Sequence, residues 1–138
     1  FDSETITRLT PLEWSGKLLD CMCSKEFLDS NPHLIHEVVV RQCEHPTPLH
    51  SIMRQVEAML TAHTYDRLPK VRAPTLVMGG TADRITPCQN LRLLASRIPN
   101  SELVIFEDLG HGMFIEGAEQ TNRVILTFLK RHSMGQVI

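Results

Sequence analysis

The feature that most constrains the fold is a strand–helix–strand pattern in the second half of the sequence. The apolar run "APTLVMGG" opens at Pro74, a residue tolerated at the first position of a strand, and we expect this strand to end near Met78. "TPCQNLRLLASRIP" predicts a helix capped by Thr86, and "SELVIFEDLG" predicts a second strand. Such a pattern within about 30 residues is typical of a βαβ unit, so we expect parallel strands with a right-handed crossover.

The remaining segments are expected to be helical. Residues 1–66 contain four successive helical patterns, and the fourth carries one apolar stripe. "GAEQTNRVILTFLKRH" predicts a closing helix with an inward face. That inward face is formed by Val124, Ile125, Phe128 and Leu129, and the earlier stripe by Ile52, Val56, Met59 and Leu60. The pattern changes near Asp66, so we divide the chain into a helical segment, residues 1–66, and a βαβα unit, residues 67–138, of the α/β class.

Composition excludes several classes of function. The formal net charge is −2 and only 5% of residues are aromatic, which argues against a nucleic-acid partner. No apolar run approaches the ~18 residues of a membrane span. Cys21, Cys23, Cys43 and Cys88 lack the spacing of a secreted disulfide framework, so we expect reduced thiols and a cytoplasmic location. A zinc site formed by the first three of these cysteines with His45 is a minor alternative, because residues two apart on a helix diverge.

Two ionisable residues follow the two predicted strands. Asp83 comes five residues after Met78, and His111 comes five residues after Phe106. The carboxyl ends of parallel strands lie along one edge of the sheet, where open α/β folds place their ligands, so we expect these side chains to meet. A carboxylate that accepts a hydrogen bond from a histidine Nδ1–H fixes the ring for proton transfer at Nε2. Asp108 and Glu107 compete for the role of the acid, but they lie close before His111 and are better explained as shaping its loop.

These motifs resemble the last two strands and helices of the α/β-hydrolases. The family places its acid in a Gly-x-x-Asp-x-x-x-Pro pattern, matched by Gly80, Asp83 and Pro87, and its histidine in a Gly-His loop, matched by Gly110 and His111. The order of acid before histidine also fits the family. The helical segment resembles the cap (lid) domain of esterase- and lactonase-like members. The resemblance therefore implies a catalytic triad in which Asp83 orients His111.

The sequence departs from the family pattern at the nucleophile. No Gly-x-Ser-x-Gly elbow is present, and Ser15 and Ser133 lack the flanking glycines. Together with the opening at Phe1, this indicates a C-terminal fragment that carries the acid and base but is inactive alone. The N-terminal half would then be a required partner. Without it, the first strand would present an open edge, and we expect the chain to self-associate.

The resemblance implies hydrolysis of a small-molecule carboxylic ester or lactone, with no metal and no organic cofactor. Met113 and Phe114 follow His111 and are candidates for contact with an acyl group, although packing of the loop explains them equally well. An aspartate nucleophile would instead give an epoxide hydrolase or dehalogenase. A non-catalytic helical interaction module is the alternative from a different class.

Overall fold

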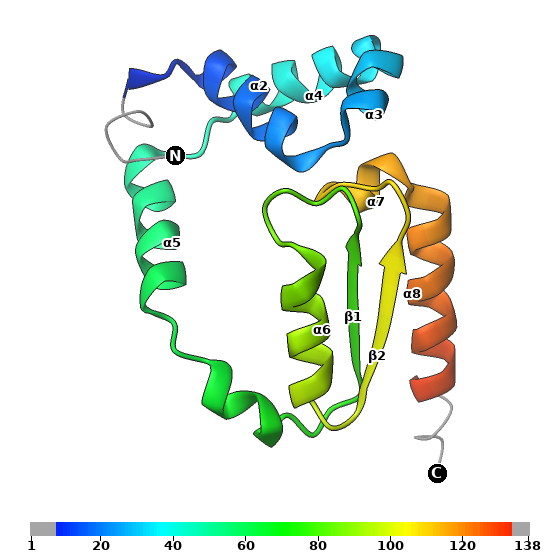
Figure 1. The fold of residues 1–138 in the computed structure, drawn as a ribbon. Coiled ribbons are helices and arrows are strands. Elements are labelled where there is room, and N and C mark those ends of the chain that lie inside the picture. The colour runs from blue at the N-terminus through cyan, green and yellow to red at the C-terminus, as the bar shows by residue number, and fades with distance from the viewer. Residues whose placement is uncertain (1–7, 134–138) are drawn as a thin grey trace.

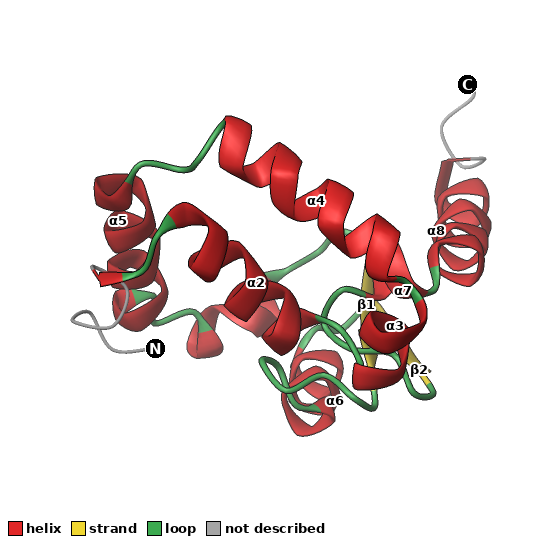
Figure 2. Cartoon of the chain, turned by 90° about the horizontal axis from the view of Figure 1, so that it is seen from above, coloured by secondary structure: helices red, strands yellow, loops and turns green. Residues whose placement is uncertain are grey.

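The computed structural model describes residues 8–133, so the first seven residues of the predicted helical segment lie outside the described residues. Between Pro11 and the sheet the chain forms the helices α2 (Pro11–Met22), α3 (Lys25–Ser30), α4 (Pro32–Glu44) and α5 (Leu49–Thr61) and the short 3₁₀ helix η1 (Tyr65–Lys70). Figures 1 and 2 show α2, α3 and α4 gathered over the carboxyl ends of the strands. From there α5 runs toward the opposite end of the sheet, where the first strand begins (Figure 1).

Local capping explains where the early helices begin. The Thr10 hydroxyl accepts a hydrogen bond from the Glu13 backbone N–H, and the Glu13 carboxylate accepts one from the Thr10 N–H, which is a complete capping box for α2. Ser24 caps α3 through its side chain, and Pro32 occupies the first turn of α4. These helices share a small core formed by Leu19, Cys23 and Val39. Burial of this apolar surface holds α2 against α4.

The βαβ unit is present, and its strands are parallel as predicted. Strand β1 (Thr75–Gly80) pairs with β2 (Ser101–Phe106) in register from the first residue of each strand to the last. Helix α6 (Cys88–Arg97) packs against both strands and buries Leu91. Strand β1 ends at Gly80 rather than at Met78, because the pairing continues to Phe106.

The predicted cap of α6 was wrong by one residue. Pro87, not Thr86, is the N-cap, and the helix begins at Cys88. Thr86 belongs instead to the preceding turn, where its backbone N–H donates to Asp83. The turn after β1 therefore extends one residue further than the sequence pattern indicates.

The chain closes with α7 (Met113–Glu116) and α8 (Ala118–Ser133), and α8 runs alongside β2 (Figure 1). The Glu102 carboxylate near the start of β2 accepts hydrogen bonds from Arg131 (2.6 Å) and lies 3.2 Å from His132 Nε2. Phe128 is buried as predicted, but Leu129 is exposed, so that part of the inward-face prediction was wrong. The apolar face of α8 is narrower than the sequence suggests.

Helix α5 carries the predicted apolar stripe but leaves its end uncovered. Met59 and Leu60 are 74% and 78% exposed, and no residue of α5 is buried. Parallel strands are usually covered on both faces, whereas most residues of β2 are only half-buried here. The described part of the chain thus leaves apolar surface on α5 and on the sheet. Within residues 8–133, no helix has the length and apolar character needed to cross a membrane.

Candidate active site

Asp83 is held by the turn that follows β1. Its Oδ1 atom accepts hydrogen bonds from the backbone N–H groups of Ile85 (2.8 Å) and Thr86 (2.7 Å). Aspartate side chains commonly stabilise turns by accepting from N–H groups two or three residues ahead. The side chain is only 4% exposed, so the turn fixes the carboxylate and keeps it out of bulk water.

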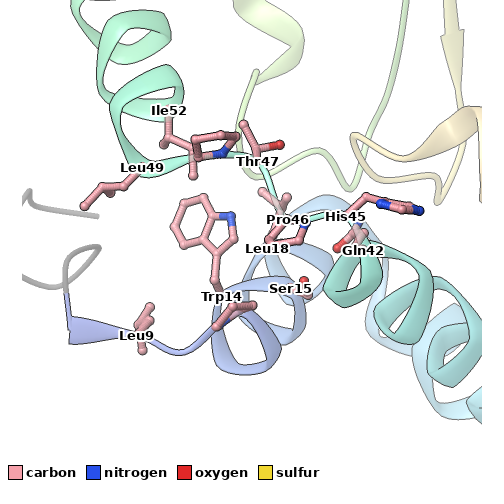
Figure 3. A pocket seen from close by; sticks show the side chains of 12 residues that line it. Leu9, Trp14, Ser15, Leu18, Gln42, His45, Pro46, Thr47, Leu49 and Ile52 are labelled. Carbon is pink, nitrogen blue, oxygen red and sulfur yellow. The ribbon is translucent and has the colours of Figure 1, made fainter.

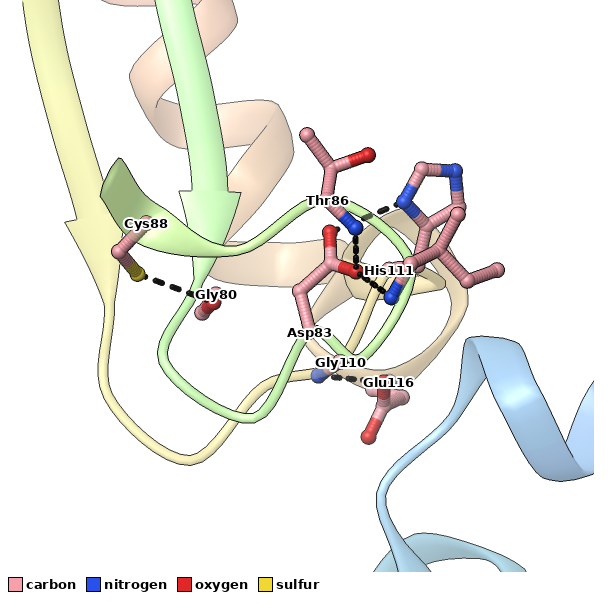
Figure 4. A network of polar contacts seen from close by, with 8 residues as sticks. Gly80, Asp83, Thr86, Cys88, Gly110, His111 and Glu116 are labelled. Atoms are coloured by element: carbon pink, nitrogen blue, oxygen red, sulfur yellow. Dashed lines mark hydrogen bonds and ion pairs between the residues drawn. The ribbon is translucent and has the colours of Figure 1, made fainter. Parts of the chain in front are cut away.

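The second oxygen of Asp83 faces His111. Asp83 Oδ2 lies 2.9 Å from His111 Nδ1. Figure 4 shows the two side chains pointing toward each other. The structure therefore brings together the two residues that the sequence singled out. The His111 ring is 39% exposed, so it is more accessible than its partner. An Nδ1–H donated to Asp83 leaves Nε2 with a lone pair, the arrangement that a general base requires.

Two glycines of the matched motifs lie where backbone segments approach too closely for a side chain. A Cβ on Gly80 would stand 1.8 Å from the carbonyl oxygen of Leu109, and one on Gly110 would stand 2.5 Å from the carbonyl oxygen of Met22. Glycine allows such close approach because it lacks a Cβ atom. Gly80 thus brings the Asp83 turn against the His111 loop, and Gly110 brings that loop against the end of α2.

Glu116 is a site residue that sequence reasoning missed. Its carboxylate accepts hydrogen bonds from Gly110, in the His111 loop, and from Ser24, at the start of α3 (Figure 4 shows the first). The two backbone donors are 86 residues apart, from 110 − 24, so no local sequence motif joins them. The sequence offers one indirect signal. Phe27, at the third position of α3, cannot accept a hydrogen bond from the Ser24 N–H as a Glu or Gln would, so that N–H needs an acceptor from elsewhere in the chain.

The other predicted contact residues lie in the short helix after His111. Met113 is half-buried and Phe114 is exposed at the start of α7. The Met113 carbonyl accepts a hydrogen bond from the buried Thr121 hydroxyl at 3.0 Å, which fixes α7 to α8. Contact of either side chain with a substrate stays a prediction.

A separate cavity of about 430 Å³ lies between α2 and the start of α5 (Figure 3). Trp14 and Leu18 line it from α2, and Leu49 and Ile52 line it from α5. None of its lining residues belongs to the strand-end site. It therefore does not form the surroundings of Asp83 and His111 in the described chain.

The cysteines do not form a metal centre in the described part of the chain. All four are free thiols, and in residues 8–133 no group of three or more His, Cys, Asp or Glu side chains is placed to hold a metal ion. Burial and, to a smaller extent, the negative charge of Glu116 together raise the pKa of the Cys23 thiol to about 11. Cys23 is therefore a protonated core residue rather than a reactive thiolate.

A parallel βαβ unit with an acid and a histidine paired beyond its strands is the arrangement of the C-terminal portion of an α/β-hydrolase. Comparison with known proteins agrees. The profile of the family described as "TAP-like protein" matches residues 50–136. This match covers more than half of the chain, so the chain belongs to that α/β-hydrolase family and corresponds to the C-terminal portion of the fold.

Individual relatives support this assignment. The poly(3-hydroxyalkanoate) depolymerase of Ectopseudomonas oleovorans is 42% identical over 71 residues, which are 51% of this chain and 25% of that protein. The 2-hydroxy-6-oxononadienedioate/2-hydroxy-6-oxononatrienedioate hydrolase 2 of Pseudomonas putida is 48% identical over 65 residues, 46% of this chain and 22% of that protein. A thermophilic esterase from Thermogutta terrifontis superposes with a TM-score of 0.78 at 25% identity, over 94% of this chain and 47% of the esterase. The chain spans less than half the length of the curated relatives it matches.

Proposed function

We propose that this chain supplies the acid and base of a serine-type α/β-hydrolase that cleaves a carboxylic ester or lactone. The observation that carries the proposal is the 2.9 Å contact between Asp83 Oδ2 and His111 Nδ1 beyond two parallel strands. The other oxygen of Asp83 is held by two backbone N–H groups, so the carboxylate is fixed before any substrate arrives. Such preorganisation is what positions a catalytic base.

In the proposed reaction, Nε2 of His111 takes the proton from a serine hydroxyl as the serine oxygen attacks the carbonyl carbon. The imidazolium that forms is stabilised by Asp83 and then gives its proton to the leaving alcohol oxygen. Water, deprotonated by His111 in the second half of the cycle, hydrolyses the acyl-enzyme and restores the serine. The serine and the oxyanion donors would come from an N-terminal half outside these 138 residues.

The helices over the strand ends support a role as a cap. Helices α2, α3 and α4 stand above the carboxyl ends of the strands, close to α7, the short helix that begins at Met113 (Figures 1 and 2). We place the boundary between cap segment (1–66) and core portion (67–138) at η1, where the chain turns into β1. The exposed Phe114 and half-buried Met113 would contact the acyl group.

The uncovered apolar surface supports the requirement for a partner half. One edge of β1 pairs with β2, and no other strand of the described residues pairs with its second edge. An open strand edge is a template for further pairing. We propose that the N-terminal half covers this edge in the intact enzyme. At micromolar concentration the isolated chain should therefore sediment as a dimer or larger species, and a monomeric profile would contradict this part of the proposal.

A non-catalytic helical interaction module is the second candidate, and the exposed end of α5 favours it. A chimera separates the two candidates. In the Thermogutta terrifontis esterase, the portion that superposes on this chain is replaced by residues 1–138, and hydrolysis of p-nitrophenyl acetate is measured. We expect turnover that His111→Ala reduces by about 10²–10⁴-fold, the contribution of a general base.

His132→Ala is the matched control, because His132 lies at the end of α8, where it contacts Glu102 and the Phe128 ring rather than Asp83. It should leave turnover within about twofold of the unchanged chimera. Equal activity of the two histidine variants would refute the role of His111. The class of nucleophile is tested separately: an upstream coding sequence with Gly-x-Ser-x-Gly supports the esterase, and an aspartate at the elbow supports an epoxide hydrolase or dehalogenase.

A further inference from the structure

The two residues that flank His111 are both tied to groups outside the strand-end loop. Gly110 donates its N–H to Glu116 Oε1 at 2.8 Å, and Gly112 donates its N–H to the carbonyl oxygen of Met22 at 2.7 Å. Met22 is the last residue of α2, where carbonyl groups lack partners within the helix. His111 is therefore held on one side by a carboxylate and on the other by the end of a helix from the first half of the chain.

Glu116 uses its second oxygen on that same first half. Glu116 Oε2 accepts a hydrogen bond from the Ser24 N–H at 2.9 Å. Ser24 is the N-cap of α3, and in a capping box the N-cap N–H is accepted by a Glu or Gln three residues later. Helix α2 follows that local rule with Glu13, but α3 has Phe27 at the equivalent position. Glu116, 92 residues further along the chain, supplies the acceptor that Phe27 lacks.

The surroundings of Glu116 leave little space for it to move. A Cβ on Gly110 would stand 2.8 Å from Glu116 Oε1, and a Cβ on Gly112 would stand 3.0 Å from the sulfur of Cys23. Cys23 is almost fully buried in the core with Leu19. The His111 loop is thus packed directly on the residues that join α2 to α3. A displacement of this junction has to be transmitted to the loop.

We propose that Glu116 is a positioning residue that fixes His111 against Asp83 by joining the His111 loop to the α2–α3 junction. One oxygen of the Glu116 carboxylate binds the His111 loop and the other binds the start of α3. The helices over the strand ends and His111 would therefore move together. A substrate that shifts those helices would then reset the His111–Asp83 contact. The coupling itself is argued from the hydrogen bonds of Glu116 and Gly112. Its importance for catalysis rests on the proposed role of His111 as the base.

The test uses the 138-residue chain and follows the His111 side chain by ¹⁵N NMR, which distinguishes an Nδ1–H from an Nε2–H imidazole. Amide hydrogen exchange at Gly110 is measured in parallel. Ser24→Pro removes the N–H that donates a hydrogen bond to Glu116. The backbone at this position accommodates proline, because the φ angle of Ser24 is −67°. Ser24→Ala removes the same hydroxyl cap and keeps the N–H, so it is the matched control.

We expect Ser24→Pro to reduce the Nδ1–H population of His111 and to speed exchange at Gly110 by about tenfold, the effect of one lost charge-assisted hydrogen bond. Ser24→Ala should leave both signals as in the unchanged chain, although it weakens α3. Glu116→Gln, which keeps only one acceptor oxygen, should reproduce the effect of Ser24→Pro. The exposed Glu119→Gln should not.

Identical His111 signals in Ser24→Pro and Ser24→Ala would overturn the proposal. If Glu116→Gln lowers stability so far that its signals are ambiguous, Thr121→Val provides the comparison. Thr121 is buried and holds α7 through Met113, but it does not contact Glu116 in any hydrogen bond found for it. Loss of the Nδ1–H signal in Thr121→Val as well as in Glu116→Gln would show a purely structural role. An inactive chimera with the coupling intact would refute the proposed function and leave this inference standing.

Discussion

Gly80→Ala should separate the two members of the strand-end pair. The new Cβ would stand 1.8 Å from the carbonyl oxygen of Leu109 and 2.4 Å from its carbon, and Cβ atoms essentially never approach other heavy atoms within 3.0 Å. The loop therefore has to retreat by at least 1.2 Å, which is 3.0 − 1.8. The obstacle is backbone, so no change of rotamer relieves it. Overpacking of this kind costs about 1–3 kcal/mol.

Displacement of the Leu109 carbonyl also affects Asp83 and His111, because both lie within two residues of the groups that move. The Leu109 carbonyl accepts a hydrogen bond from the Ala82 N–H at 2.9 Å, and Ala82 and Leu109 precede Asp83 and His111 by one and two residues. Loss of that bond adds about 0.5–1.5 kcal/mol, so we expect the free energy of unfolding to fall by about 1.5–4.5 kcal/mol in total. A full 1.2 Å shift along the contact would lengthen the 2.9 Å separation of Asp83 and His111 to about 4.1 Å, beyond hydrogen-bond range.

Gly79→Ala is the matched control. Its Cβ would stand 2.3 Å from Cδ1 of Leu91, the end of a flexible side chain that can turn aside. Because Leu91 is buried, this repacking also costs about 1–3 kcal/mol, but it does not displace the His111 loop. Urea unfolding followed by circular dichroism gives the stabilities, and ¹⁵N NMR gives the His111 tautomer. A retained Nδ1–H signal in Gly80→Ala, or a lost one in Gly79→Ala, would refute the expected separation of Asp83 and His111.

Three further changes test other parts of the structure. In the chimera, Asp83→Asn should present an amide N–H to His111, favour the wrong tautomer and lower turnover by about 10³–10⁴-fold; unchanged turnover would exclude Asp83 as the acid. Asp108 has a φ of 59°, a conformation that strains an alanine but not a glycine, so Asp108→Gly should be more stable than Asp108→Ala by about 1–2 kcal/mol in urea unfolding; the reverse order would contradict backbone strain. The hydrogen bond from His132 and, second to it, the hydrogen bond from Arg131 lower the pKa of Glu102 below its usual 4.5. The ionised Glu102 carboxylate therefore contributes its full stabilisation above pH 4.5, and this stabilisation is lost as the pH falls through the lowered pKa. Glu102→Gln should flatten the acid side of the stability curve, and identical acid limbs would refute this pairing.

The sequence predicts the parts of the site that depend on neighbours along the chain. Alternation of strand and helix patterns places Asp83 and His111 at one sheet edge, because parallel strands end together. The burial of α5 could not be predicted in the same way. Its apolar stripe is a property of the helix, but whether Met59 and Leu60 are covered depends on what packs against them, and the described chain leaves both exposed.

The role of Glu116 could not be predicted from the sequence either. An acidic residue in "FIEGAE" has no local pattern that marks it, because its two donors come from Gly110 and from Ser24. Only the close approach of the two halves of the chain places that carboxylate between them. Gly110, by contrast, belongs to a recognisable motif, although the reason for it, contact with the Met22 carbonyl, became evident only from the structure.

The acid and the proposed base differ in what holds them. Asp83 accepts hydrogen bonds from N–H groups two and three residues ahead in its own turn, and that turn is joined to the His111 loop by the hydrogen bond from the Ala82 N–H to the Leu109 carbonyl. His111 is fixed through Gly110 and Gly112, whose partners are Glu116 and the end of α2. In the proposed coupling, movement of the helices over the strand ends would act on His111 directly, through Gly110 and Gly112, and on Asp83 only through the loop. If the chain serves as the proposed hydrolase, a substrate that shifts those helices would therefore adjust the base more than the acid, because the hydrogen bonds to Glu116 and Met22 do not involve Asp83.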